Sequence, residues 1–352
     1  MLPVYRDILG HEAIIARLEN ARRTGRVAHA YLFHGPRGVG KEKVAWAFAA
    51  ALACPAPEPC GACESCTRIA RNTHPDVRLL ASEEELDARG LLSVPDDADN
   101  RAEKRVPSEQ IRVSDLDQAA DLFRHRPSLG RIKALLVVDA ERMNMSTQNR
   151  FLKTLEEPTP DSVIILCTAQ PEALLATVRS RCQAVGFGPV PRPMVAQFVS
   201  SRTGLAPEAA WTVAGLAQGS PGRALEIAGS DELSARAELV DATLRALQGD
   251  IEDALSLAEE LSAGGEGREQ VRVALDRIEM WLRDALLLSL QAPSELMLQP
   301  DLEAKARPVA ERAGSRRLFA WLDGVRSARE SLQANVNPRL TVENFLLSVR
   351  EP

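Results

Sequence analysis

The stretch that most constrains this chain is a glycine-rich turn between an apolar segment and a helical pattern. Residues 31–33 lead into His-Gly-Pro-Arg-Gly-Val-Gly-Lys, and a helical pattern runs from residue 44 to residue 52. A buried strand, a turn whose N–H groups face an anion, and a helix N-terminus together form a phosphate-binding loop. The spacing G-x-x-x-x-G-K fits such a loop. Its candidate nucleotide-binding residues are Gly35, Gly38, Gly40 and Lys41.

Part of the chemistry of an ATPase is missing from this loop. Glu42 stands where Ser or Thr would give a hydroxyl to Mg²⁺, so we expect a negative charge where metal and phosphates would sit. Residues 134–139 (Ala-Leu-Leu-Val-Val-Asp) indicate a buried parallel strand, whose final Asp139 would hold the Mg²⁺ shell or merely cap the following turn. Ala140 replaces the acid that would polarise water, and we expect Glu141 to leave by the opposite face. The loop is therefore interpreted as a vestigial ATPase site.

Four of the six cysteines lie within thirteen residues, next to three prolines and a glycine that supply turns. Their spacing is C-x5-C-x2-C-x2-C, and four thiolates can wrap a tetrahedral ion with no position left for water. The sequence predicts a structural Zn²⁺ site made by Cys54, Cys60, Cys63 and Cys66. The alternative is a pair of disulfides or four unrelated cysteines. Cys167 and Cys182 have no neighbouring ligand and are left out of the site.

Alternating strand and helix patterns continue after the cysteines. Residues 76–81 and 162–168 indicate further strands, which predicts a doubly wound parallel α/β sheet. Residues 82–105 are acidic and polar and are interpreted as a solvated loop with no assigned role. Ser108 is expected to cap a helix that continues to about Phe123.

Strand signals fade after about residue 188. Prolines at 189, 191 and 193 mark a hinge, short helical patterns follow, and the chain is helical nearly to its end after residue 230. We expect three domains: 1–188 with a zinc module at 54–66, a small helical domain at 189–230, and a helical domain at 231–352.

Charge and hydropathy restrict the function classes. The 352-residue chain has a formal net charge of −6, which argues against a protein that binds nucleic acid over its whole surface. It has no run of 18 apolar residues and no signal-peptide pattern at its start. We therefore expect a cytoplasmic protein with reduced cysteines.

Taken together, these motifs resemble the AAA+ subunits of the bacterial DNA polymerase III clamp loader. The resemblance covers essentially the whole chain and rests on the loop, the four cysteines, Phe-Leu-Lys-Thr-Leu-Glu-Glu-Pro at 151–158, and Ser-Arg-Cys at 180–182. Within this family the chain is most similar to the delta-prime branch. That preference rests on Thr-His-Pro-Asp at 73–76, Gly-Ser-Pro-Gly at 219–222 and Asn-Val-Asn-Pro-Arg-Leu at 335–340.

The resemblance implies an architecture and a role. Residues 1–188 would be a P-loop AAA+ domain, 189–230 a helical lid, and 231–352 an all-α collar that holds a five-subunit ring. The chain would be a largely non-hydrolysing stator that joins motor (gamma/tau) and delta subunits to load the sliding clamp on primed DNA. It would have no ATP turnover of its own while serving a DNA-directed DNA polymerase holoenzyme, a nucleotidyltransferase complex. Passive binding of ATP or ADP stays open.

One residue would act in trans. In the resembled family the Ser-Arg-Cys arginine, here Arg181, reaches the γ-phosphate held by a neighbouring motor. The simpler alternative is a surface arginine paired with a carboxylate of its own chain, and Arg179 is the nearest competitor. Two other function classes compete with the stator: an active gamma/tau-type ATPase, disfavoured by Glu42 and Ala140, and a nucleotide-free adaptor that binds DNA directly, disfavoured by the net charge.

Overall fold

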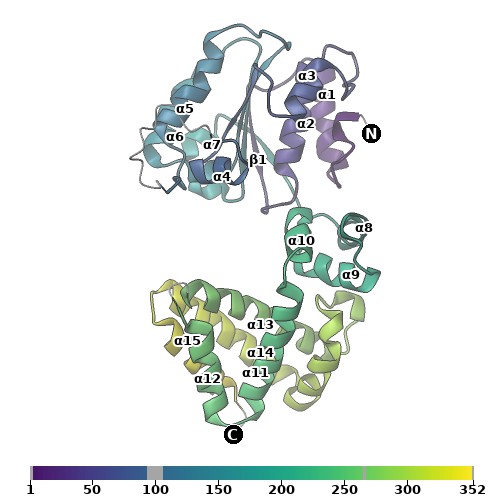
Figure 1. Cartoon of the computed structure of the whole chain (residues 1–352), viewed down its shortest axis with the longest axis vertical. Coiled ribbons are helices and arrows are strands. Elements are labelled where there is room, and N and C mark those ends of the chain that lie inside the picture. The colour runs from purple at the N-terminus through teal and green to yellow at the C-terminus, as the bar shows by residue number, and fades with distance from the viewer. Residues whose placement is uncertain (1–2, 93–105, 265–266, 351–352) are drawn as a thin grey trace. The chain divides into compact units, whose positions relative to one another are not determined.

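The computed structural model of the chain describes residues 3–92, 106–264 and 267–350. The chain divides into two compact units (Figure 1). The first comprises Met1–Pro191 with Ser220–Gly222, and the second comprises Arg192–Gly219 with Arg223–Pro352. The division of the second part into lid and collar at residue 230 stays a prediction.

A five-stranded parallel sheet forms the centre of the first unit. Its strands are β1 (Ala30–His34), β2 (Val77–Leu80), β3 (Lys133–Val137), β4 (Ser162–Thr168) and β5 (Gln183–Gly186). They lie in the order β2-β3-β4-β1-β5, and every neighbouring pair is parallel. The inner strands are mostly apolar, with polar residues only near their ends, because helices cover both faces of the sheet. The predicted α/β, AAA+-like sheet is confirmed.

Helices on the two faces enclose two separate apolar cores. On one face lie α1 (Glu12–Arg23), α2 (Lys41–Ala53) and α3 (Glu64–Ala70); on the other lie α5 (Val113–Ala120), α6 (Met145–Glu156) and α7 (Ala176–Arg179) (Figure 1). Alternate residues of one strand serve the two cores: Leu136 packs with Phe48 of α2, whereas Leu135 packs with Phe151 of α6.

Two sequence expectations in this unit are corrected. The helix expected from Ser108 begins only at Val113, because residues 111–112 run extended: Ile111 forms a parallel bridge with Met143, and the N–H of Arg112 donates to Asp115. A 3-10 turn, Asp121–Arg124, follows α5. The first part of the expected solvated loop is instead a helix, α4 (Glu83–Ala88). The remainder of that loop, 93–105, lies outside the described residues.

The second unit is all helical in its described residues. Its elements are α8 (Arg192–Thr203), α9 (Pro207–Leu216), α10 (Pro221–Ala228, whose first two residues count with the first unit), α11 (Glu232–Gln248), α12 (Ile251–Ser262), α13 (Gly267–Ser289), α14 (Glu303–Gln333) and α15 (Pro338–Val349). Helix α14 is interrupted at Gly314, whose φ of 69° is not helical. The predicted helical C-terminal region is confirmed.

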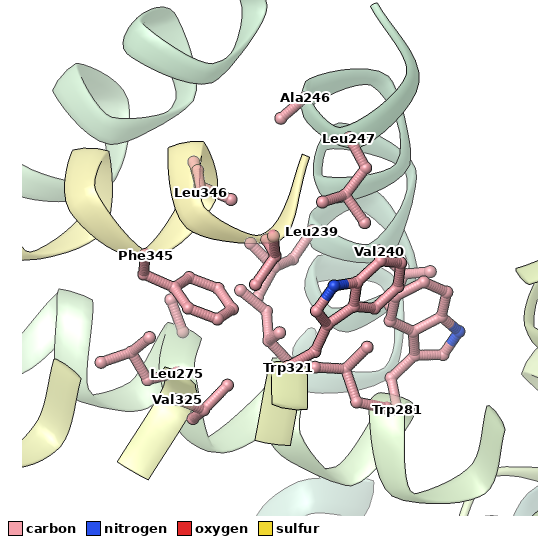
Figure 2. Packing of buried hydrophobic residues seen from close by; sticks show 14 of the residues in the cluster. Leu239, Val240, Ala246, Leu247, Leu275, Trp281, Trp321, Val325, Phe345 and Leu346 are labelled. Carbon is pink, nitrogen blue, oxygen red and sulfur yellow. The ribbon is translucent and has the colours of Figure 1, made fainter. Parts of the chain in front are cut away.

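Large aromatic side chains fill the core of this helical region. Trp281 of α13, Trp321 of α14 and Phe345 of α15 lie among aliphatic residues that include Leu239 and Val240 of α11 (Figure 2). Trp281 is fully buried. Burying such side chains contributes most of the stability of a helical bundle, because each removes a large apolar area from water. Among the described residues, none of the helices is long and apolar enough to cross a membrane.

Candidate phosphate-loop site and candidate metal centre

The loop between β1 and α2 has the backbone shape that its glycines predict. Gly35, Gly38 and Gly40 all have positive φ angles, of 147°, 73° and 111°. At Gly35 a Cβ atom would lie 2.2 Å from the carbonyl oxygen of Phe187, so no other residue fits there without a backbone shift. The ring Nε2 of His11 donates to the carbonyl of Val39 at 2.9 Å and holds the loop from α1.

Lys41, which would contact phosphates in an ATPase, is committed to the loop itself. Its Nζ donates to the carbonyl oxygens of Gly35 and Pro36, each at 2.7 Å, and the residue is only 8% exposed. Burial lowers the pKa of Lys41, and the negative groups nearby, among them Glu141, oppose that shift. Its position as the first residue of α2 is the predicted one, whereas its bonding partners are backbone carbonyls of its own loop.

The carboxylate of Glu42 is paired rather than left facing the loop. Arg89 donates to both of its oxygens, at 2.6 and 2.9 Å, and the indole N–H of Trp46 donates to one of them at 3.0 Å. Burial alone would raise the pKa of Glu42, but the hydrogen bonds and charge of Arg89 outweigh burial and lower it. The expected negative charge at this position is present, but the guanidinium of Arg89 neutralises it.

The sequence does not identify Arg89 as a partner of the loop, because residues 82–105 are interpreted as a solvated loop. The signal was present: Ser82-Glu-Glu-Glu85 fits the capping pattern S-x-x-E, and Glu85 stands four residues before Arg89. In the structure, the Oγ of Ser82 accepts from the N–H of Glu85, and the carboxylate of Glu85 accepts from Arg89 at 2.7 Å. The sequence could have predicted α4 but not its partner Glu42, which is 47 residues away.

Asp139 follows β3 at the same edge of the sheet as the loop. Its backbone is left-handed, with φ 48° and ψ 55°, and a 3-10 turn, Ala140–Arg142, follows it. Burial raises the pKa of Asp139, and the charge of Glu141 raises it further. The expectation that the side chain of Glu141 leaves by the opposite face of the sheet is wrong. The left-handed backbone of Asp139 interrupts the alternation of side chains between the two faces. One oxygen of Glu141 accepts from the N–H of Ala169, just beyond β4, and its charge acts on both Asp139 and Lys41.

These residues do not fit a Mg²⁺–nucleotide complex. The hydroxyl that would bind the metal is absent, and the carboxylate in its place is held by Arg89. The amino group that would meet the phosphates is bound to two carbonyls. Lys41 and Glu42 already have partners within the chain, so the loop keeps the backbone shape of a nucleotide site while these two side chains are engaged elsewhere.

The four clustered cysteines form a different kind of site at the other end of α2. Their sulfur atoms all lie within 4.8 Å of one another. The Sγ of Cys54 is 3.7 Å from that of Cys60 and 3.8 Å from that of Cys63. A tetrahedral ion with zinc–sulfur bonds of about 2.3 Å places its ligands about 3.8 Å apart. The cluster is compatible with a structural metal site.

Local structure explains how the cysteines meet. Cys54 is the residue after α2, Cys63 is the N-cap of α3, and Cys66 lies inside α3. The backbone N–H groups of Ala62 and Cys63 lower the pKa of Cys60 to about 6, which favours its thiolate. All six cysteines are free thiols, so the structure gives no support to the disulfide alternative. Cys167 and Cys182 lie outside the cluster, as predicted, and burial raises the pKa of each.

The Thr-His-Pro-Asp motif that follows the cysteines has a structural role. Asp76 is 3% exposed and accepts hydrogen bonds from the N–H groups of Ser128, Leu129 and Gly130 and from the hydroxyl of Ser128. Its own N–H donates to the ring of His74 at 3.1 Å. The motif therefore fastens the turn before β3 to the start of β2.

Arg181 lies between α7 and β5, and β5 is an edge strand, as expected. Its Nη2 donates to the carboxylate of Glu156, at the end of α6, at 2.6 Å, and its Nη1 donates to the carbonyl of Thr177 at 2.9 Å. The Arg181 side chain is 35% exposed. The own-chain carboxylate of the simpler alternative is thus present, although such a half-exposed pair is weak enough to exchange for a phosphate. Arg179 is exposed at the end of α7.

Two family models match this chain. Residues 10–191 match the family described as "DNA polymerase III, delta subunit", and residues 230–351 match "DNA polymerase III, delta subunit, C terminal". Together they cover the sheet unit and most of the helical region.

Individual relatives agree with these models. The chain is 30% identical to DNA polymerase III subunit delta-prime of Pseudomonas aeruginosa, over 91% of each chain. It is 28% identical to the delta-prime subunit of Escherichia coli, over 95% of this chain and 92% of that one. Similarity to subunit tau/gamma of Haemophilus influenzae is 33% but covers only 51% of this chain and 23% of that protein.

Proposed function

Because this chain belongs to the delta-prime subunits of bacterial DNA polymerase III, we propose that it serves the clamp loader as a stator that does not hydrolyse ATP. Its role would be to shape the ring and to complete the active site of a neighbouring motor subunit. The observation that carries this proposal is the Glu42–Arg89 ion pair. A carboxylate stands at the position of the metal ligand, and an arginine of the same chain binds it. A phosphoryl-transfer site without its metal loses most of its charge stabilisation.

The competing functions meet specific obstacles. An active ATPase of the gamma/tau type would need the metal ligand and the water-polarising acid, whereas this chain has Glu42 and Ala140. A direct DNA adaptor would need a basic surface, whereas the chain carries a net charge of −6. Passive binding of ATP or ADP would have to displace the bonds of Lys41 to its own loop.

The proposed partners are the motor (gamma/tau) and delta subunits in a five-subunit ring, and through that complex the sliding clamp and primed DNA. Residues 231–352 are proposed as the collar that holds the ring, and residues 189–230 as the lid. Support comes from the helical make-up of this region and from the match of residues 230–351 to the C-terminal family model. A replication subunit of this kind would work in the cytoplasm.

We propose Zn²⁺ as the resident ion of the four-cysteine cluster, with a structural role. Zinc favours four thiolates in a tetrahedron, and the observed sulfur separations of 3.7 and 3.8 Å suit its radius. Cys54, Cys60, Cys63 and Cys66 would all bind it, so no open position is left for catalysis. The ion would join the end of α2 to α3, two elements that the chain connects by a short proline-rich turn.

We propose Arg181 as the arginine finger supplied to the neighbouring motor. A guanidinium is permanently charged and can bind two phosphate oxygens, and the position of Arg181 beside an edge strand leaves it accessible to another subunit. Its partner Glu156 would hold the side chain in the isolated chain and release it when a γ-phosphate offers a stronger partner.

The test is a loader reconstituted with Arg181→Ala. We expect the ring to assemble and its DNA-stimulated ATPase to fall by up to ~10³-fold at the neighbouring site, because that site loses the charge that stabilises the transition state. Arg179→Ala is the matched control and should leave the rate unchanged. A reconstituted Arg181→Ala ring that hydrolyses ATP and loads clamps at the unmutated rate would reduce Arg181 to a surface charge.

A further inference from the structure

The guanidinium of Arg89 lies between two carboxylates beside the first turn of α2. It donates to both oxygens of Glu42, and its Nε and Nη2 donate to Glu85 at 2.8 and 2.7 Å. The three side chains are only 23–30% exposed. Glu42 occupies the residue position that supplies a metal ligand in a working phosphate loop, so Arg89 sits against the place where that metal would bind.

Helix α4, which Arg89 caps at its C-terminus, is fastened at its other end as well. The carboxylate of Glu83 accepts from the N–H of Ser108 at 2.9 Å and pairs with Arg112. The N–H of Glu84 donates to the carbonyl of Ser108, and its carboxylate pairs with Arg142 at 2.5 Å. A six-residue helix with few apolar contacts would otherwise fray, so these bonds hold Arg89 in place.

The charges around the loop show what Arg89 replaces. Asp139 and Glu141 lie at the same sheet edge, and the charge of Glu85 raises the pKa of Asp139. Without Arg89, the carboxylates of Glu42 and Glu85 would face one another within reach of a single cation. Clustered carboxylate oxygens of this kind bind hard divalent ions. With Arg89 in place, the positive charge that these carboxylates need is already supplied by the chain itself.

We propose that Arg89 is a built-in substitute for the divalent metal, and that helix α4 thereby keeps the phosphate loop closed to Mg²⁺–nucleotide. The guanidinium bonds Glu42 at both oxygens and is never deprotonated, so the closed state does not depend on metal concentration. The inference rests on the proposed loss of ATPase chemistry and deepens it. The guanidinium of Arg89 occupies the site of the metal, so replacing Glu42 alone would not make that site available.

The experiment measures Mn²⁺ binding to the isolated, zinc-loaded chain by electron paramagnetic resonance, together with thermal unfolding. Arg89→Ala should lower the melting temperature by about 3–6 °C, because two half-buried carboxylates lose their partner. It should also bind one Mn²⁺ at least ~10-fold more tightly than the unmutated chain does. Added Mn²⁺ should reverse most of the decrease in melting temperature. Arg112→Ala, which weakens the other end of α4, should gain no Mn²⁺ site.

A second pair of variants keeps the proposal falsifiable if Arg89→Ala unfolds. The double variant Glu42→Thr/Arg89→Ala leaves one carboxylate, Glu85, without its partner instead of two, and it restores a hydroxyl at residue 42. This double variant should bind Mg²⁺ with a fluorescent ADP analogue more tightly than Glu42→Thr alone does. Arg89→Ala without a Mn²⁺ site, or a single Glu42→Thr that binds as tightly as the double variant, would overturn the proposal. Either result leaves the Arg181 finger and the stator role untouched, because those are measured in the assembled loader.

Discussion

The two ends of helix α2 carry two sites that differ in what their ligand atoms already contact. At its N-terminus, Lys41 and Glu42 are bonded to the loop's own carbonyls and to Arg89. At its C-terminus, Cys54 begins a cluster of four sulfurs whose only common partner would be an added ion. One helix of thirteen residues thus connects a site whose side chains already have partners to a cluster of ligands that could bind an added ion.

The difference follows from the chemistry of each group. Thiolates repel one another, so four of them cannot satisfy each other and need an external cation. At the loop end the lysine donates to backbone carbonyls and the arginine donates to the glutamate, so these groups have partners without a ligand. A binding motif therefore indicates a functional site only when its ligand atoms lack partners within the fold.

The largest effect should come from the cysteine end. Cys63→Ser removes one ligand but leaves a residue that can cap α3, and we expect zinc affinity to fall by more than ~100-fold, since even outer-shell partners cost 10–100-fold. Elemental analysis of protein purified under reducing conditions should find one zinc per chain before the substitution and almost none after it. The sheet should remain folded, because its cores do not depend on the cluster.

Cys182→Ser is the control for this measurement, because Cys182 lies outside the cluster and its loss should leave the zinc content unchanged. Unmutated protein that contains no zinc after purification would contradict the claimed difference between the two ends of α2, because neither end would then bind a ligand.

A smaller effect should come from the loop end. Because the folded-state pKa of Glu42 lies below its ordinary value of 4.5, its ionised form adds stability that is fully present above that pH and disappears as the pH falls through the folded-state pKa. Glu42→Gln should cost about 1–2 kcal/mol in the free energy of unfolding at neutral pH. Stability measured by urea denaturation from pH 7 to pH 3 should consequently fall less steeply in the variant.

Glu64→Gln, at the first residue of α3 beside the cysteine cluster, provides the matched control. Glu64 pairs with Arg68 in an exposed i,i+4 contact, which should contribute about 0.3–0.5 kcal/mol at most. Equal losses at Glu42 and Glu64 would show that the Arg89 pair is an ordinary surface contact, and the distinction between the two ends would then lose its physical basis.

Regular patterns predicted most of the fold. Apolar runs at residues 134–138 and 162–168 indicated the inner strands, and glycine spacing indicated the loop shape, because both follow from local rules of burial and backbone freedom. The cysteine cluster was predictable for the same reason: its four ligands lie within thirteen residues.

The features that sequence reasoning missed depend on contacts between distant residues or on one unusual torsion. The partner of Glu42 is 47 residues away, at the C-cap of a helix that an acidic, polar composition concealed. The placement of Glu141 depends on the left-handed backbone of Asp139, which strand alternation cannot anticipate. Both errors concern the loop end of α2, where the local motif is intact and its bonding has changed.

The most direct test of the account measures ATP hydrolysis and zinc content on one preparation of the isolated chain, alongside Lys41→Ala. The account predicts one zinc per chain in both proteins and a rate of ATP hydrolysis in the unmutated chain no higher than in Lys41→Ala, because the metal-binding hydroxyl is replaced by Glu42 and Arg89 holds that carboxylate. Steady turnover by the unmutated chain that disappears in Lys41→Ala would contradict the account and show a working ATPase.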